Sequence, residues 1–154
     1  MDPTVMTALA KAGGLAALGL AAVGSSLGAG TAGASSIGAW KKCYAQGKAA
    51  PFMLVTFIGA PLSQTIYGMI LMLTINGKVA SPEWVATHWA ASLLCGICGG
   101  LGMMASAWYQ GVAGAAGADA LAETGQGFSN YLMTLGVVET VALFVLVFSM
   151  IGLG

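Results

Sequence analysis

Four long stretches of this sequence are almost free of charged side chains, and they constrain most strongly what the chain can fold into. The stretches are residues 12–40, 49–77, 84–118 and 124–154. The first three contain no Asp, Glu, Lys or Arg, although the third contains one histidine, and the last contains a single acid, Glu139. A helix that crosses the hydrocarbon core of a bilayer needs about 20 apolar residues, so each stretch is long enough. Because barrel strands would alternate between apolar and polar residues and these stretches do not, the sequence predicts four transmembrane helices.

The overall composition points to the same class of protein. Hydrophobic residues make up 58% of the chain and charged residues only 6%, whereas a soluble domain carries about 25% charged residues. Five basic and five acidic residues leave no net charge, and nucleic-acid binding would need a basic patch. The composition therefore excludes a soluble enzyme, a disordered chain and a nucleic-acid-binding protein.

The four stretches form two related pairs, which indicates a tandem duplication of one helical hairpin. The first and third stretches are long and rich in glycine, whereas the second and fourth carry larger side chains. Ser26-Leu27-Gly28 aligns with Gly100-Leu101-Gly102, and Gln64-Thr65 aligns with Glu139-Thr140 at nearly the same offset. A hairpin repeated in parallel orientation puts both of its turns on the same side of the membrane.

Proline and its neighbours mark the expected helix boundaries. Asp2-Pro3 and Ser81-Pro82 each put an N-cap residue before a proline that suits the first helical turn, and Asn76-Gly77 is expected to end the second helix. We therefore predict two hairpins with two helices each. The first hairpin covers residues 1–77, with helices at about 4–40 and 49–76, and the second covers residues 78–154, with helices at about 82–118 and 125–153.

The glycine-rich helices and the lysines predict how such chains assemble and face the membrane. In lipid, helices associate through close backbone approach, which small residues permit. Two helices this small over their whole length are expected on the crowded inner circle of a ring of copies. Three lysines, Lys41, Lys42 and Lys48, follow the first helix. The positive-inside rule then predicts cytoplasmic hairpin turns and external termini.

Glu139 is the residue most indicative of function, because it lies near the middle of the last apolar stretch. A carboxylate at the bilayer centre costs roughly 3 kcal/mol on insertion scales, so an acid at this position is interpreted first as a functional residue. A helix-packing role, with a protonated and hydrogen-bonded Glu139, is the structural alternative.

Polar side chains in the second and third stretches could serve as partners of this acid. The second stretch aligns four residues on one helix face by their spacing, namely Ala60, Ser63, Gln64 and Tyr67. Pro61 removes one backbone donor and disturbs the turn around it, and the third stretch adds Gln110. Oxygen ligands of this kind suit a hard cation such as Na⁺. A proton on Glu139, or a hydrogen-bond network without an ion, would also satisfy these groups.

The same residues carry a family resemblance. The pattern Pro61-x-x-Gln64-x-x-Tyr67-Gly68, combined with Val138-Glu139-Thr140 and the duplicated hairpin, resembles the membrane rotor proteolipid of V-type ATPases, the 16-kDa c or K subunit. The resemblance covers the whole chain and implies a non-catalytic subunit in which Glu139 carries the ion. Its sodium-transporting members imply a ligand set with one orienting residue: Glu139, Gln64, Gln110, Ser63 and the backbone carbonyl of Ala60 as ligands, and Tyr67 to steady the carboxylate.

The resemblance also implies the mechanism and the partners. Identical copies form a ring, Na⁺ is the transported ion without any organic cofactor, and the bound ion neutralises Glu139 while the ring turns through membrane lipid. A stator subunit supplies an Arg that forces ion release, and central-stalk subunits transmit ATP hydrolysis. A bacterial cell membrane with cytoplasmic hairpin turns fits this interpretation. A proton-translocating proteolipid, a small four-helix secondary transporter and a structural pore proteolipid stay open as alternatives.

Overall fold

The computed structural model describes residues 1–154 and contains helices and turns but no strand. In chain order the elements are α1 (Pro3–Ala45), α2 (Leu54–Gly59), the short 3₁₀ helix η1 (Ala60–Leu62), α3 (Ser63–Lys78), α4 (Pro82–Thr124) and α5 (Phe128–Gly152). Since α2, η1 and α3 form one continuous span, four helical spans are long and apolar enough to cross a membrane. The predicted all-helical membrane fold is therefore confirmed.

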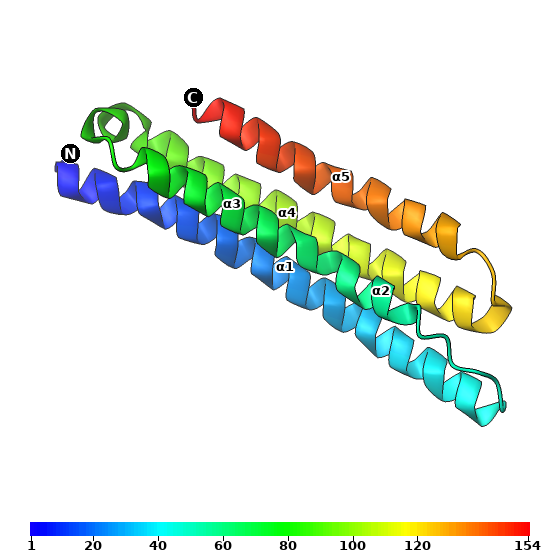
Figure 1. Ribbon diagram of the computed structural model, residues 1–154. Coiled ribbons are helices and arrows are strands. Elements are labelled where there is room, and N and C mark those ends of the chain that lie inside the picture. Colours follow the sequence, from blue (N-terminus) through cyan, green and yellow to red (C-terminus); the bar gives the residue numbers. More distant parts are fainter.

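The spans lie side by side as two hairpins that run in the same direction. Both chain ends are at one end of the molecule and both hairpin turns are at the other (Figure 1). The glycine-rich helices α1 and α4 make the most extensive contact in the molecule. The α2–α3 span packs on both of them, whereas α5 packs mainly on α4 and only to a small extent on α3. As a result, α5 is the least enclosed helix.

The long helices extend beyond the predicted ends at residues 40 and 118. Both α1 and α4 have 43 residues, or about 65 Å at 1.5 Å per residue, which exceeds the hydrocarbon core of about 30 Å. Lys41 and Asp119 marked the exit from these apolar stretches, but both are exposed on the helix surface, and a charged side chain there does not end a helix. The chain instead turns at Gly47 and Gly125, whose φ angles of 64° and 67° lie in the left-handed region.

The second span also differs at both ends from the prediction of residues 49–76. Its helix begins at Leu54 and continues through Asn76-Gly77 to Lys78. The prediction that Asn76-Gly77 ends the helix was therefore wrong, because Gly77 does not adopt the positive φ of a helix-ending glycine. The next helix begins as predicted, with the Ser81 hydroxyl accepting a hydrogen bond from the backbone N–H of Trp84 at 3.3 Å.

Glycines allow the backbones of α1 and α4 to touch. A Cβ atom added to Gly96 would collide with the carbonyl of Gly13, and one added to Gly111 would collide with the backbone of Gly28. Close backbone approach of this kind is how helices associate in lipid. Many small residues thus serve contacts inside one chain, although the sequence pattern alone suggested contacts within a ring. Gly19 still has nothing within 4 Å of an added Cβ, so part of the α1 surface remains free.

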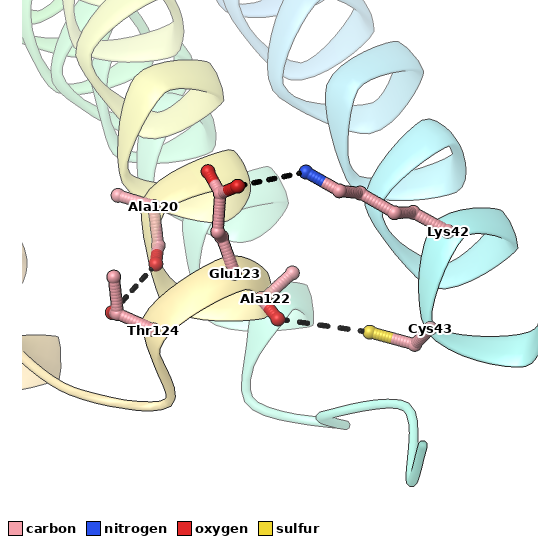
Figure 2. Close-up of polar contacts among 6 residues, drawn as sticks. All are labelled: Lys42, Cys43, Ala120, Ala122, Glu123 and Thr124. Atoms are coloured by element: carbon pink, nitrogen blue, oxygen red, sulfur yellow. Dashed lines mark hydrogen bonds and ion pairs between the residues drawn. The ribbon is translucent and has the colours of Figure 1, made fainter. Parts of the chain in front are cut away.

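A small polar cluster shows that the C-terminal ends of α1 and α4 lie level. Lys42 Nζ lies 3.2 Å from Glu123 Oε1, and Cys43 Sγ lies 3.9 Å from the carbonyl oxygen of Ala122 (Figure 2). Both charged side chains are exposed; such a surface pair stabilises by about 1 kcal/mol or less. The pair nevertheless shows that the two repeats are parallel and in register at the turn end.

Two apolar clusters lie at different levels of the bundle and leave a polar level between them. Nearer the turns, Phe57 packs against Phe128 and Tyr131, with ring centroids 5.7 and 6.4 Å apart. Nearer the chain ends, Leu71 and Leu146 belong to a second buried cluster. The polar side chains of α3, α4 and α5 that the sequence singled out lie between these clusters.

Candidate functional site

Glu139 of α5 is held toward the interior of the bundle by two hydrogen bonds from other helices. The Tyr67 hydroxyl of α3 donates to Glu139 Oε1 at 2.6 Å. The amide nitrogen of Gln110, on α4, donates to Glu139 Oε2 at 3.2 Å. Hydrogen bonds to a carboxylate are stronger than those between neutral groups. The acid on α5 is therefore bound firmly to both α3 and α4.

Two buried glutamines continue the network away from the carboxylate. Gln64 Nε2 donates to Gln110 Oε1 at 2.8 Å, and both side chains are 0% exposed. Gln110 Nε2 also donates to the backbone carbonyl of Leu135 at 3.1 Å. Because a buried amide without partners would cost several kcal/mol, these bonds fix the two glutamines beside Glu139.

The short 3₁₀ turn around Pro61 brings a hydroxyl and a carbonyl to the same place. Ser63 Oγ donates to the carbonyl of Ala60 at 3.1 Å and lies 3.2 Å from Gln64 Oε1. Proline has no N–H to donate, and the turn tightens at Ala60–Leu62 before α3 continues. The six residues predicted from the sequence are therefore all joined in one connected network.

Ser106 belongs to this network and was not among the residues predicted from the sequence. Its hydroxyl accepts from Gln64 Nε2 at 3.4 Å and donates to the backbone carbonyl of Val138 at 3.0 Å. Ser106 lies four residues before Gln110, so both occupy one face of α4. That spacing was a usable signal, but serine is so common in this small-residue helix that it did not stand out.

The chemistry of the donors fits a monovalent hard cation. The network gathers a single carboxylate and neutral oxygens from Gln64, Gln110, Ser63 and the Ala60 carbonyl, and hard cations prefer oxygen ligands. The chain contains no group of three or more His, Cys, Asp or Glu side chains that could hold a metal ion. In this structure Gln110 turns its nitrogen toward Glu139, so ligation through its oxygen requires its amide to rotate.

The fold and the site define an integral, multi-pass membrane protein with one acid at mid-span. The family model for the C subunit of ATP synthase matches residues 93–152, which hold Ser106, Gln110 and Glu139 but amount to less than half of the chain. The match supports an ion-carrying rotor proteolipid, since the matched family consists of non-catalytic membrane subunits that form rings of identical copies. No curated protein matches the chain significantly.

Proposed function

We propose that this protein is the rotor-ring subunit of a V-type ATPase and that it binds and transports Na⁺ at Glu139. The observation that carries the proposal is the connected network of oxygen-bearing groups that ends on that acid, contributed by α3, α4 and the turn at Ala60. A proton would need only the carboxylate and one or two donors. Two buried glutamines and a serine beside the acid are better explained by a metal ion that needs several oxygens.

The duplicated hairpin supports the V-type assignment. Gln64 occupies in the first repeat the position that Glu139 occupies in the second, so each chain of four spans carries one carboxyl group at mid-depth. A ring with one carrier per four spans moves fewer ions in each full rotation than a ring with one carrier per hairpin, and so it moves fewer ions per ATP. At a fixed energy per ATP, each ion can be moved against a steeper gradient, which suits a pump.

In the proposed cycle, bound Na⁺ neutralises Glu139 and lets the site pass through hydrocarbon at low cost. Tyr67 and Gln110 hold the carboxylate in place while the ring turns. At the stator, an Arg from that partner protein competes for Glu139 and releases the ion. Soluble subunits hydrolyse ATP and drive the ring through a central stalk. Both hairpin turns face the cytoplasm in a bacterial cell membrane, as the three lysines of the first turn, Lys41, Lys42 and Lys48, indicate.

An open groove along α4 and α5 supports assembly into a ring. Three cavities of about 570, 460 and 370 Å³ follow one another between these helices. Residues such as Cys98, Gly102 and Ala113 line them from α4. Within one chain, α3 packs on two glycine-rich helices, α1 and α4. Its counterpart in the second repeat, α5, packs on α4 but has no comparable contact with α1. In a ring, the α1 helix of the next copy would fill this groove.

Proton transport by the same ring is the second candidate. It is favoured by the nitrogen of Gln110, which faces Glu139 and donates to it. In that arrangement the carboxyl group is satisfied by protein donors without a metal ion. The two candidates share the rotor function and differ only in the ion.

Equilibrium binding of isotope-labelled Na⁺ to the purified oligomer tests the proposal. We expect saturable binding of one ion per chain, with loss of binding in Glu139→Gln and full retention in Glu123→Gln, whose carboxylate lies at the exposed turn end. Electron microscopy of the same sample is expected to show rings. A monomer or dimer in mild detergent would contradict the rotor function, and rings that bind no Na⁺ would favour the proton carrier.

A further inference from the structure

Ser25 of α1 is a buried hydroxyl without a hydrogen-bond partner. Its side chain is 2% exposed, and the only other buried polar side chain left unpaired is Ser36 of the same helix. A buried group without a partner costs about 1–3 kcal/mol. Such an exception in a protein interior calls for an explanation.

Contacts between α1 and α3 put Ser25 at the level of the site. A Cβ atom added to Gly68 would meet Ala21, and one added to Gly28 would meet Pro61. The two helices therefore run antiparallel, with these two contacts one above the other. Ser25 follows Ala21 by one helical turn on the same face, so it lies level with Gln64, one turn before Gly68.

The amide oxygen of Gln64 can accept a further hydrogen bond at this level. Its amide nitrogen uses both of its protons, toward Ser106 and Gln110. The Ser63 hydroxyl lies 3.2 Å from its amide oxygen but has a single proton, which it donates to the Ala60 carbonyl at 3.1 Å. The two lone pairs of the Gln64 oxygen are therefore free for an ion and for one further donor. A free acceptor on Gln64 and a free donor on Ser25 thus lie on facing turns of α3 and α1.

We propose that Ser25 is a positioning residue that donates to Gln64 Oε1 through one water and so fixes which end of that amide faces the ion. The inference rests on the proposed function of Na⁺ binding. A glutamine side chain presents either its oxygen or its nitrogen, and only the oxygen binds a cation. A donor on α1 keeps the oxygen and nitrogen ends from exchanging, which lowers the cost of organising the site when the ion arrives.

Two matched serine variants of the full-length ring test this assignment by Na⁺ binding. Ser25→Ala is expected to bind Na⁺ about three- to tenfold more weakly, the effect of one neutral hydrogen bond, and to discriminate Na⁺ from Li⁺ less well than the wild type. The Na⁺ affinity of Ser25→Cys, whose thiol is a weaker donor, should lie between those of Ser25→Ala and the wild type. Ser36→Ala removes the other unpaired hydroxyl and should leave the affinity and selectivity unchanged.

The same Na⁺-binding measurements can overturn the proposed role of Ser25. If Ser25→Ala binds Na⁺ with wild-type affinity and selectivity, or if Ser36→Ala loses as much, Ser25 has no positioning role. Failure of the proposed function would be seen separately, as an absence of Na⁺ binding in the wild-type ring itself. Both alanine variants remove only one buried oxygen, so the ring is expected to assemble, and its size on a native gel checks this.

Discussion

The hydroxyl of Tyr67 donates a 2.6 Å hydrogen bond to Glu139, and this bond joins the first hairpin to the second. Tyr67 lies on α3 and Glu139 on α5, two helices that otherwise touch only sparsely. The candidate ion site therefore depends on both halves of the duplicated chain. In the first repeat Gln64 occupies the position that Glu139 has in the second, and Gln64 is linked to that carboxylate through Gln110.

Tyr67→Phe should weaken ion binding while keeping the ring intact. The change removes the donor to Glu139 Oε1 but keeps the aromatic ring and its packing. A hydrogen bond to a charged group contributes about 1.5–3 kcal/mol, so the dissociation constant for Na⁺ is expected to rise at least about tenfold. Tyr109→Phe is the control, because the Tyr109 side chain is exposed and forms none of the hydrogen bonds of the network. Equal binding by both variants would remove Tyr67 from the site.

Ser106→Ala should also weaken Na⁺ binding, although its spacing from Gln110 was only a weak signal in the sequence. Its hydroxyl accepts from Gln64 and donates to the carbonyl of Val138, one residue before Glu139. Loss of these neutral hydrogen bonds is expected to raise the dissociation constant about three- to tenfold. Thr140→Ala is the matched control, since Thr140 is exposed and bonds only to its own helix at Val137. An unchanged constant for Ser106→Ala would mean that Gln64 needs no support from α4.

The strongest sequence signals were those with few competing explanations. A lone acid in a charge-free stretch, and polar residues spaced along one helix face, predicted Glu139, Gln64 and Tyr67 as neighbours, and the network joins all three. Ser106 escaped because a hydroxyl among many small residues is not a distinctive signal. Which end of a glutamine amide faces the acid depends on tertiary contacts, so no pattern in the sequence could predict it.

Helix ends and packing partners were harder to infer than the spans themselves. Charged residues predicted where the apolar stretches end, but α1 and α4 continue as helices until Gly47 and Gly125 adopt left-handed conformations. The glycine stripes predicted close packing without naming the partner. The same small residues could face the sister helix or a neighbouring copy, and only the structure separates Gly96, which touches Gly13, from Gly19, which touches nothing.

Gly96→Ala should destabilise the chain much more than another glycine substitution in a long helix. A Cβ atom at Gly96 would meet the backbone of Gly13, so α1 and α4 would have to separate, and overpacking of this kind costs about 1–3 kcal/mol. Gly38→Ala meets nothing within 4 Å and gains helix propensity of up to about 1 kcal/mol. Thermal unfolding in detergent should rank Gly38→Ala at or above the wild type, and Gly96→Ala below it. The reverse order would contradict this helix packing.

Disulfide cross-linking can identify the face that meets the next copy. Cys98 is exposed in the largest cavity between α4 and α5. If packing between copies repeats the α1–α4 packing within one chain, Cys98 faces the next copy's α1 near Gly19 and Val23. We expect Gly19→Cys or Val23→Cys to form a ladder of oligomers on oxidation, because a head-to-tail contact links every copy to the next.

The control for this experiment is a cysteine on the outer face of α3. Leu73 is exposed, like the two α1 positions, but lies away from the α4–α5 groove. Leu73→Cys should give no ladder, and removal of Cys98 by Cys98→Ala should abolish the ladder of the α1 variants. Cross-linking through Leu73→Cys instead would assign the interface between copies to a different face.

Sodium carriage by Glu139 can be tested directly with a carbodiimide, which modifies buried protonated carboxyl groups, at constant pH and increasing Na⁺. Mass spectrometry of the purified ring would follow the labelled residue. We predict that Na⁺ slows labelling of Glu139 in a saturable way, and that a lower pH raises the Na⁺ concentration needed for protection, because protons compete for the same carboxylate. Labelling that changes with pH and ignores Na⁺ would contradict a sodium carrier and leave a proton carrier in its place.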